Sequence, residues 1–96
     1  MRLMGLAEYR TEVEEIDEKI IKLIQQRMDA SKKIFQAKKV EGLEIIDLQQ
    51  EKLVLRRAMD LATELNLDAG DIRDLFEILI RMSLQKQQEL QGRDQG

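Results

Sequence analysis

The sequence predicts an all-α protein with three helices in one domain, the first of them very long. The 96-residue chain contains no proline and only five glycines, so few residues in it interrupt a helix. In addition, apolar residues recur with the spacing of a single helical face in three successive segments. The length fits one domain, and we assign residues 1–96 to it.

The longest helix is predicted over residues 6–40. We take Arg27 as the reference direction and turn by about 100° per residue. Lys38 then points the same way as Arg27, three helical turns further on. Two cations therefore lie in a stripe that is otherwise mostly apolar. The other side chains within roughly 40° of this direction are Tyr9, Val13, Ile16, Ile20, Leu23, Ser31 and Ile34.

The length of this helix predicts that the chain associates with another copy. A helix over residues 6–40 is roughly 50 Å long, because each residue adds about 1.5 Å. A compact domain of 96 residues has a radius of gyration of only about 12–13 Å. The rest of the chain is thus too small to cover the stripe, and we expect an intertwined oligomer. An isolated coiled coil is the structural alternative.

Two shorter helices are predicted after the first. Gly42 is the expected stop of the long helix, since glycine readily adopts the left-handed conformation that ends helices. The second helix is expected over residues 48–66 with Asp47 as its N-cap, and the third over residues 69–90. Their apolar faces consist of Val54, Leu55, Ala58, Leu61, Ala62 and Leu65 in the second helix and of Ile72, Phe76, Leu79, Ile80 and Leu90 in the third.

The ends of the third helix and of the chain are also predicted. Asp68 is the expected N-cap of the third helix, with Asp71 favourably placed near its positive end. Residues 1–5 and 91–96 are expected to be frayed, because they are polar or contain glycine and lie at the termini.

Composition excludes several classes of function. The net charge is −3 with acidic and basic residues interspersed, and only three residues are aromatic, so no nucleic-acid partner is expected. The absence of cysteine and histidine argues against disulfides, thiolate chemistry and a zinc site. We expect no metal and no cofactor. No apolar run has membrane-spanning length and no signal peptide is evident, so we expect a cytoplasmic protein without a membrane partner.

Five polar side chains are predicted on the apolar faces of the three helices. Singly, each has an ordinary explanation; a lysine or arginine on such a stripe usually extends to water. Together they are harder to dismiss, because burying a charge costs several kcal/mol unless it is paired. Two cations, a carboxylate and two neutral hydrogen-bonding groups suit a small polar anion that carries a hydroxyl. The five residues are Arg27, Lys38, Glu51, Ser83 and Gln87.

The chemistry expected of such a site is limited by what the chain lacks. Without histidine or cysteine there is no Ser–His pair and no thiolate nucleophile. If the protein is an enzyme, its reaction should depend on positioning and charge stabilisation rather than on a covalent intermediate.

The chain resembles the all-helical chorismate mutases of the AroQ class over residues 6–90. Several short motifs carry the resemblance, and their spacing agrees with that of the family, including the loop between the inward lysine and the second helix. These motifs are Tyr9-Arg10, Ile16-Asp17-Glu18-Lys19, Leu23-Ile24-Gln25-Gln26-Arg27, Ala37-Lys38, Asp47 with Glu51, and Ser83-Leu84-Gln85-Lys86-Gln87.

The resemblance implies an intertwined homodimeric helical bundle, with two active sites that convert chorismate to prephenate in phenylalanine and tyrosine biosynthesis. No cofactor takes part. In such enzymes the cation at Arg27 clamps substrate carboxylate, while Lys38 and Gln87 contact the ether oxygen. Arg10 comes from the other subunit. Its direction, about 100° from that of Arg27, agrees with a role outside its own chain's pocket.

The resemblance also assigns the remaining site residues. Asp47 and Glu51 accept from the ring hydroxyl or align their neighbours, and Ser83 assists at a carboxylate. The expected catalytic residues are thus Arg27, Lys38, Glu51 and Gln87, with Arg10, Asp47, Gln50 and Ser83 completing the substrate-binding set. The expected apolar walls are Ile34, Val54, Ile80 and Leu84.

One residue departs from the family pattern. The family usually has arginine immediately before the glutamate of the second helix, whereas this chain has Gln50. Glutamine donates hydrogen bonds without charge, so we expect weaker substrate binding but intact chemistry. Two alternative functions remain at this point. One is an isochorismate pyruvate-lyase with a similar cationic pocket, against which the Asp47/Glu51 pair argues. The other is a non-catalytic helical dimerisation module whose inward charges fix register.

Overall fold

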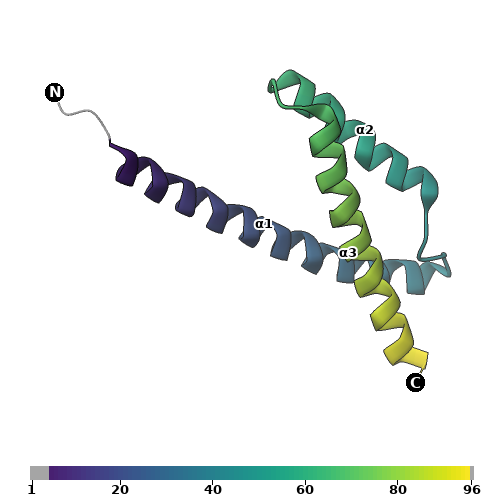
Figure 1. The fold of residues 1–96 in the computed structure, drawn as a ribbon. Coiled ribbons are helices and arrows are strands. Elements are labelled where there is room, and N and C mark those ends of the chain that lie inside the picture. The colour runs from purple at the N-terminus through teal and green to yellow at the C-terminus, as the bar shows by residue number, and fades with distance from the viewer. Residues whose placement is uncertain (1–4, 96) are drawn as a thin grey trace.

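The computed structural model describes residues 5–95, which form three α-helices and, within that range, no strand. Figure 1 shows α2 and α3 lying alongside each other, with α3 crossing the C-terminal half of α1, while the N-terminal half of α1 extends away from both. The predicted all-α fold with one very long helix is therefore confirmed. The bounds are Leu6–Glu41 for α1, Leu48–Glu64 for α2 and Ala69–Gln95 for α3.

Local sequence explains where α1 begins and ends. At the start, the carboxylate of Glu8 accepts a hydrogen bond from the Gly5 N–H at 2.9 Å. At the end, Gly42 has a φ of 71°, a left-handed conformation that glycine adopts without a steric penalty. The Leu43 N–H then donates to the Lys38 carbonyl at 2.8 Å, which satisfies a carbonyl of the last turn. The predicted stop at Gly42 is confirmed.

Aspartate side chains begin the other two helices, as predicted. The Gln50 N–H donates to Asp47 Oδ1 at 3.1 Å, and the Asp71 N–H donates to Asp68 Oδ1 at 2.8 Å. These bonds satisfy backbone donors that have no partner inside the helix. The prediction for the end of α2 was wrong by two residues: the helix stops at Glu64, because Asn66 has a φ of 59° and cannot continue it.

The third helix is longer than predicted at its C-terminal end. Helix α3 continues to Gln95, past the expected end at Leu90. An ion pair one turn apart supports this extension, because Arg93 Nη2 lies 2.8 Å from Glu89 Oε1. Gly92 lies inside the helix and lowers its propensity without ending it. Of the segments expected to be frayed, residues 1–4 and 96 lie outside the described residues.

The apolar core is small and is centred on α3. Within the described part of the chain, α3 packs closely against both α1 and α2, whereas the backbones of α1 and α2 lie further apart. Phe35 of α1 and Ala58 and Ala62 of α2 are buried. The predicted apolar face of α3 is half-buried along its length, but Leu61 and Leu65 of α2 remain exposed.

The chain is elongated, and the N-terminal half of α1 has no cover within it. The principal extents are 62 × 28 × 16 Å, and the radius of gyration is 17.7 Å rather than the 12–13 Å or so of a compact chain. The surface area of 8029 Å² also exceeds the roughly 5,700 Å² of a compact monomer of this mass. The stripe residues Tyr9, Val13, Ile16, Ile20 and Leu23 are 46% to 61% exposed.

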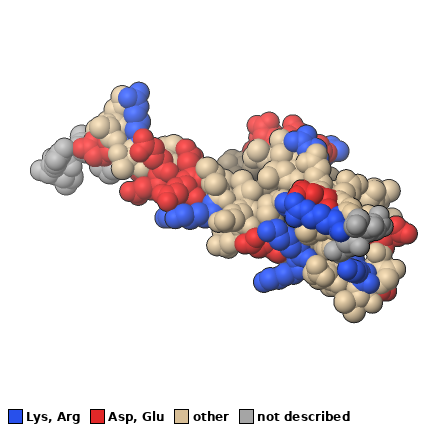
Figure 2. Space-filling model, turned by 90° about the horizontal axis from the view of Figure 1, so that it is seen from below, with Lys and Arg blue, Asp and Glu red and all other residues tan. Residues whose placement is uncertain are grey.

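Charge is distributed unevenly along the long helix. Figure 2 shows acidic side chains gathered on the part of α1 that projects beyond α2 and α3, with lysines and arginines more frequent over the three-helix region.

Over residues 5–95, no helix is long and apolar enough to cross a membrane.

Candidate active site

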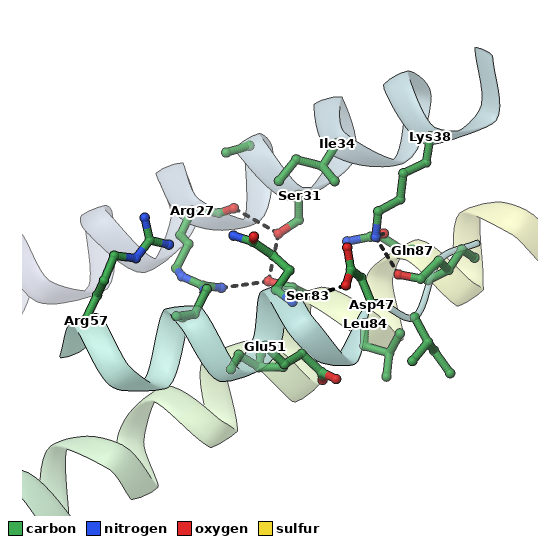
Figure 3. A pocket seen from close by; sticks show the side chains of 16 residues that line it. Arg27, Ser31, Ile34, Lys38, Asp47, Glu51, Arg57, Ser83, Leu84 and Gln87 are labelled. Carbon is green, nitrogen blue, oxygen red and sulfur yellow. Dashed lines mark hydrogen bonds between the residues drawn. The ribbon is translucent and has the colours of Figure 1, made fainter. Parts of the chain in front are cut away.

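A pocket of about 320 Å³ lies where the three helices meet, within the range typical of sites for small molecules. Both α1 and α2 pack on α3, and the wider separation of their backbones leaves a space between them. Figure 3 shows polar side chains from all three helices pointing into this space. The lining residues are Arg27, Ala30, Ser31, Ile34 and Lys38 of α1, Ile45, Ile46 and Asp47 before α2, Gln50, Glu51, Val54 and Arg57 of α2, and Ile80, Ser83, Leu84 and Gln87 of α3.

A hydrogen-bond network fixes Arg27 at one end of the pocket. Its Nη1 donates to Ser83 Oγ at 2.8 Å and to the Leu79 carbonyl at 3.3 Å, both on α3. The hydroxyl of buried Ser31 lies 2.7 Å from Ser83 Oγ and 3.1 Å from the Arg27 carbonyl. These contacts join α1 to α3 and hold the guanidinium in a defined orientation (Figure 3).

The charge of Arg27 is not compensated by the described residues. Its hydrogen-bond acceptors are a hydroxyl and a carbonyl, and no carboxylate of residues 5–93 forms an ion pair with it. Burial lowers the pKa of the Arg27 guanidinium, because the charged form loses solvation. A bound anion would restore the lost stabilisation, so this end of the pocket favours a carboxylate.

Lys38 and Gln87 meet at the other end. The Lys38 ammonium donates to the Ile45 carbonyl in the loop before α2 and lies 3.5 Å from Gln87 Oε1. Gln87 is buried, with only 6% of its surface exposed. Since its oxygen faces the ammonium, its amide nitrogen remains available as a donor. Two donors from different helices, one of them charged, thus converge on one region (Figure 3).

Helix α2 supplies the acidic side of the pocket. Asp47 and Glu51 are four residues apart at the beginning of this helix, so their side chains lie on the same face. One oxygen of Asp47 caps the helix, whereas the Glu51 carboxylate has no hydrogen-bond partner among the described residues. Carboxylates in this position can accept a hydrogen bond from a hydroxyl of a bound molecule.

The structure brings seven of the eight sequence-predicted site residues into one pocket: Arg27, Lys38, Asp47, Gln50, Glu51, Ser83 and Gln87. All four expected wall residues, Ile34, Val54, Ile80 and Leu84, line it as well. Arg10 does not. It is exposed on the projecting half of α1, seventeen residues before Arg27 and therefore about 25 Å away along the helix.

Sequence reasoning missed two polar residues of the pocket, Ser31 and Arg57. A signal existed for both. Ser31 lies on the same helical stripe as Arg27, one turn further on, but a serine hydroxyl attracts less notice than a cation in an apolar face. Arg57 follows Gln50 by seven residues, which is two turns, so both residues lie on the pocket face of α2.

This arrangement can bind and orient a small anion but offers no nucleophile with an adjacent base. Three cations and two carboxylates line the pocket. The two serine hydroxyls are hydrogen-bonded to each other and to Arg27, so neither has a general base beside it. Arg27, Lys38 and Gln87 are held by hydrogen bonds before any ligand arrives. Such a site suits a reaction whose transition state gains negative charge on one oxygen.

Comparison with known proteins agrees with this geometry. The family model described as chorismate mutase type II matches residues 9–88, which is most of the chain. The chain belongs to the type II chorismate mutase family. The chorismate mutase of Methanocaldococcus jannaschii is 39% identical over 84 residues, and the match covers 85% of each protein.

Other chorismate mutase relatives are longer proteins. A bifunctional chorismate mutase/prephenate dehydratase of Buchnera aphidicola is 34% identical over 82 residues, and that of Escherichia coli K12 is 30% identical over 81 residues. In each case the match covers about 85% of this chain but only 21% of the relative. The shared region therefore corresponds to about a fifth of each bifunctional protein.

Proposed function

We propose that the protein converts chorismate to prephenate in the pocket between α1, α2 and α3. The observation that carries the proposal is the position of Arg27, Lys38 and Gln87, which face one cavity from two helices in a chain of the chorismate mutase family. The reaction is an intramolecular Claisen rearrangement, in which one C–O bond breaks as one C–C bond forms. It needs no proton transfer, which suits a pocket without a nucleophile. A cytoplasmic location belongs to the same proposal.

One group of residues binds and orients the substrate, and another stabilises the transition state. Arg27 clamps a carboxylate and so holds the folded, reactive conformer, using the planar guanidinium that Ser83 and Leu79 already orient. Lys38 and the amide nitrogen of Gln87 stabilise the negative charge that grows on the ether oxygen as the C–O bond breaks. Glu51 and Asp47 accept from the ring hydroxyl. Fixed donors in a largely apolar pocket are effective because little reorganisation is required during the reaction.

The proposal includes an intertwined homodimer in which Arg10 reaches the pocket of the partner chain. Three features support it. The apolar stripe on the projecting half of α1 is about half exposed, and the surface area exceeds that of a compact monomer by roughly 2,300 Å². A stable interface buries about 800 Å² on each partner, so this excess is ample. Arg10 lies on the projecting half and is too far from its own pocket to enter it.

The assembly yields a direct prediction. The native protein should be a dimer at micromolar concentration, because the exposed apolar stripe on the projecting half of α1 has no cover within the described chain. Light scattering coupled to size exclusion measures the mass. About twice the chain mass of 11.2 kDa is expected. A folded monomer would contradict the intertwined arrangement.

The activity itself is tested by incubating the protein with chorismate and following the loss of its absorbance. We expect decay with formation of prephenate. The isochorismate pyruvate-lyase alternative predicts little reaction with chorismate and release of pyruvate from isochorismate. A dimerisation module without catalysis predicts no change with either compound. The family membership favours the first outcome.

Gln50 provides a prediction about affinity. It lines the pocket but carries no charge, whereas chorismate mutases of this class usually have arginine at this position. Gln50→Arg should lower KM for the dianionic substrate several-fold with kcat little changed, because the added cation strengthens binding of substrate and transition state alike. Gln49→Arg is the matched control, since Gln49 is exposed and outside the pocket. An unchanged or higher KM in Gln50→Arg would show that another group already supplies this charge.

A further inference from the structure

Arg57 is the one cation of the pocket that neither the hydrogen-bond network nor the proposed mechanism uses. It lines the same cavity as Arg27 and Lys38, yet it forms no hydrogen bond or ion pair with any side chain of residues 5–93. The neighbouring Arg56 is exposed and does not line the cavity. An unpaired guanidinium directed toward a site for a dianion therefore calls for a functional explanation.

The course of the chain places Arg57 near the carboxylate-binding end. The loop after α1 brings Asp47 close to Lys38, because Lys38 donates to the Ile45 carbonyl just before it. Helix α2 then runs back past the pocket, and Arg57 lies ten residues further on, about 15 Å along the helix. Figure 3 shows its guanidinium at the end of the pocket where Arg27 lies, away from Lys38.

Arg57 also shares a helical face with the uncharged Gln50. The two residues are seven apart, so their side chains leave α2 within about 20° of the same direction. Val54 lies between them on that face and forms part of the wall. A long, exposed arginine on this face can follow the wall and place its charged end over the cavity.

We infer that Arg57 binds a carboxylate of the substrate and supplies part of the positive charge that position 50 lacks. This inference rests on the proposed function and adds a binding residue to it. The cavity must hold a dianion, and Arg27 and Lys38 already serve its two opposite ends (Figure 3). A planar guanidinium offers paired donors that match a carboxylate. Because Arg57 is partly solvated, its contribution is to binding rather than to charge developed in the transition state.

A structural role for Arg57 is the competing explanation. Acidic side chains gather on the projecting half of α1 (Figure 2), and in a dimer that half would lie against the partner chain. Arg57 could then form an ion pair across the interface. This alternative predicts a weaker dimer on removal of the arginine, with an unchanged KM wherever the dimer is intact.

The experiment compares steady-state kinetics on chorismate for the wild-type chain, Arg57→Ala, Arg57→Lys, the control Arg56→Ala and the double variant Arg57→Ala/Gln50→Arg. Arg57→Ala should raise KM about tenfold, the effect of losing one charge-assisted hydrogen bond, with kcat within about twofold. Arg57→Lys should lie between it and the wild type, because lysine keeps the charge without the fork. Arg56→Ala should match the wild type, and the added arginine at position 50 should reverse most of the KM increase.

Each failure has a distinct meaning. A wild-type chain that does not consume chorismate would overturn the proposed function. An active wild type with an unchanged KM in Arg57→Ala would overturn only the role of Arg57, as would an equal rise in Arg56→Ala. Absence of rescue in the double variant would refute a shared role for positions 50 and 57. Light scattering on each variant detects dissociation, and a KM increase that disappears once the dimer is restored would establish the structural explanation.

Discussion

Replacing Lys38 with alanine is expected to lower kcat by about 100- to 1,000-fold, the usual effect of removing one preorganised donor to a developing oxyanion. Lys38 and Gln87 converge on one region of the pocket, and only Lys38 carries a charge. The negative charge on the ether oxygen develops in the transition state. The loss should therefore appear mainly in kcat rather than in KM.

Two controls separate this effect from a structural one. Lys38 also donates to the Ile45 carbonyl, so its removal could loosen the loop before α2. Circular dichroism and the melting temperature of Lys38→Ala would detect such a change. Lys33→Ala serves as the matched variant, because Lys33 is exposed on the same helix and outside the pocket. A defect of Lys38→Ala confined to KM would show that the lysine binds substrate without stabilising the transition state.

The fold was predictable because its signals are local. The periodicity of α1, the glycine that ends it and the aspartates that begin α2 and α3 all act within a few residues, and each was confirmed. The two misplaced helix ends have equally local causes. Asn66 adopts a left-handed conformation that glycine more often supplies, and Arg93 pairs with Glu89 across a segment whose polarity had indicated fraying.

The pocket was predictable to the extent that its residues interrupt an apolar face. A cation such as Arg27 or Lys38 is conspicuous there, because an apolar stripe normally excludes charge. Ser31 escaped notice because serine is tolerated in many settings, and only the packing of α1 on α3 shows its hydroxyl next to Ser83. Arg57 was not predicted because one arginine among the charged residues of α2 gives no signal of its own, and only its spacing of seven residues from Gln50 indicates the pocket face.

The placement of Arg10 in a partner's pocket can be tested by mixing two inactive variants. Arg10→Ala and Arg27→Ala should each be nearly inactive as homodimers, because every site lacks one carboxylate-binding arginine. Unfolding the two together and refolding them as an equal mixture should give about half mixed dimers. In a mixed dimer, the Arg10→Ala chain keeps its own Arg27 and receives an intact Arg10 from its partner. Its pocket is therefore complete, while the other pocket lacks both arginines.

The mixture should recover about a quarter of wild-type activity, since half of the dimers hold one complete site out of two. The structure gives a definite expectation, because Arg10 lies about 25 Å along α1 from Arg27 and therefore cannot reach the pocket of its own chain. If Arg10 served its own chain, every site in every dimer would still lack one arginine and mixing would restore nothing. Refolding each variant alone is the control for activity gained by refolding itself. Zero recovery, with mixed dimers demonstrated by differently tagged chains, would refute the shared site.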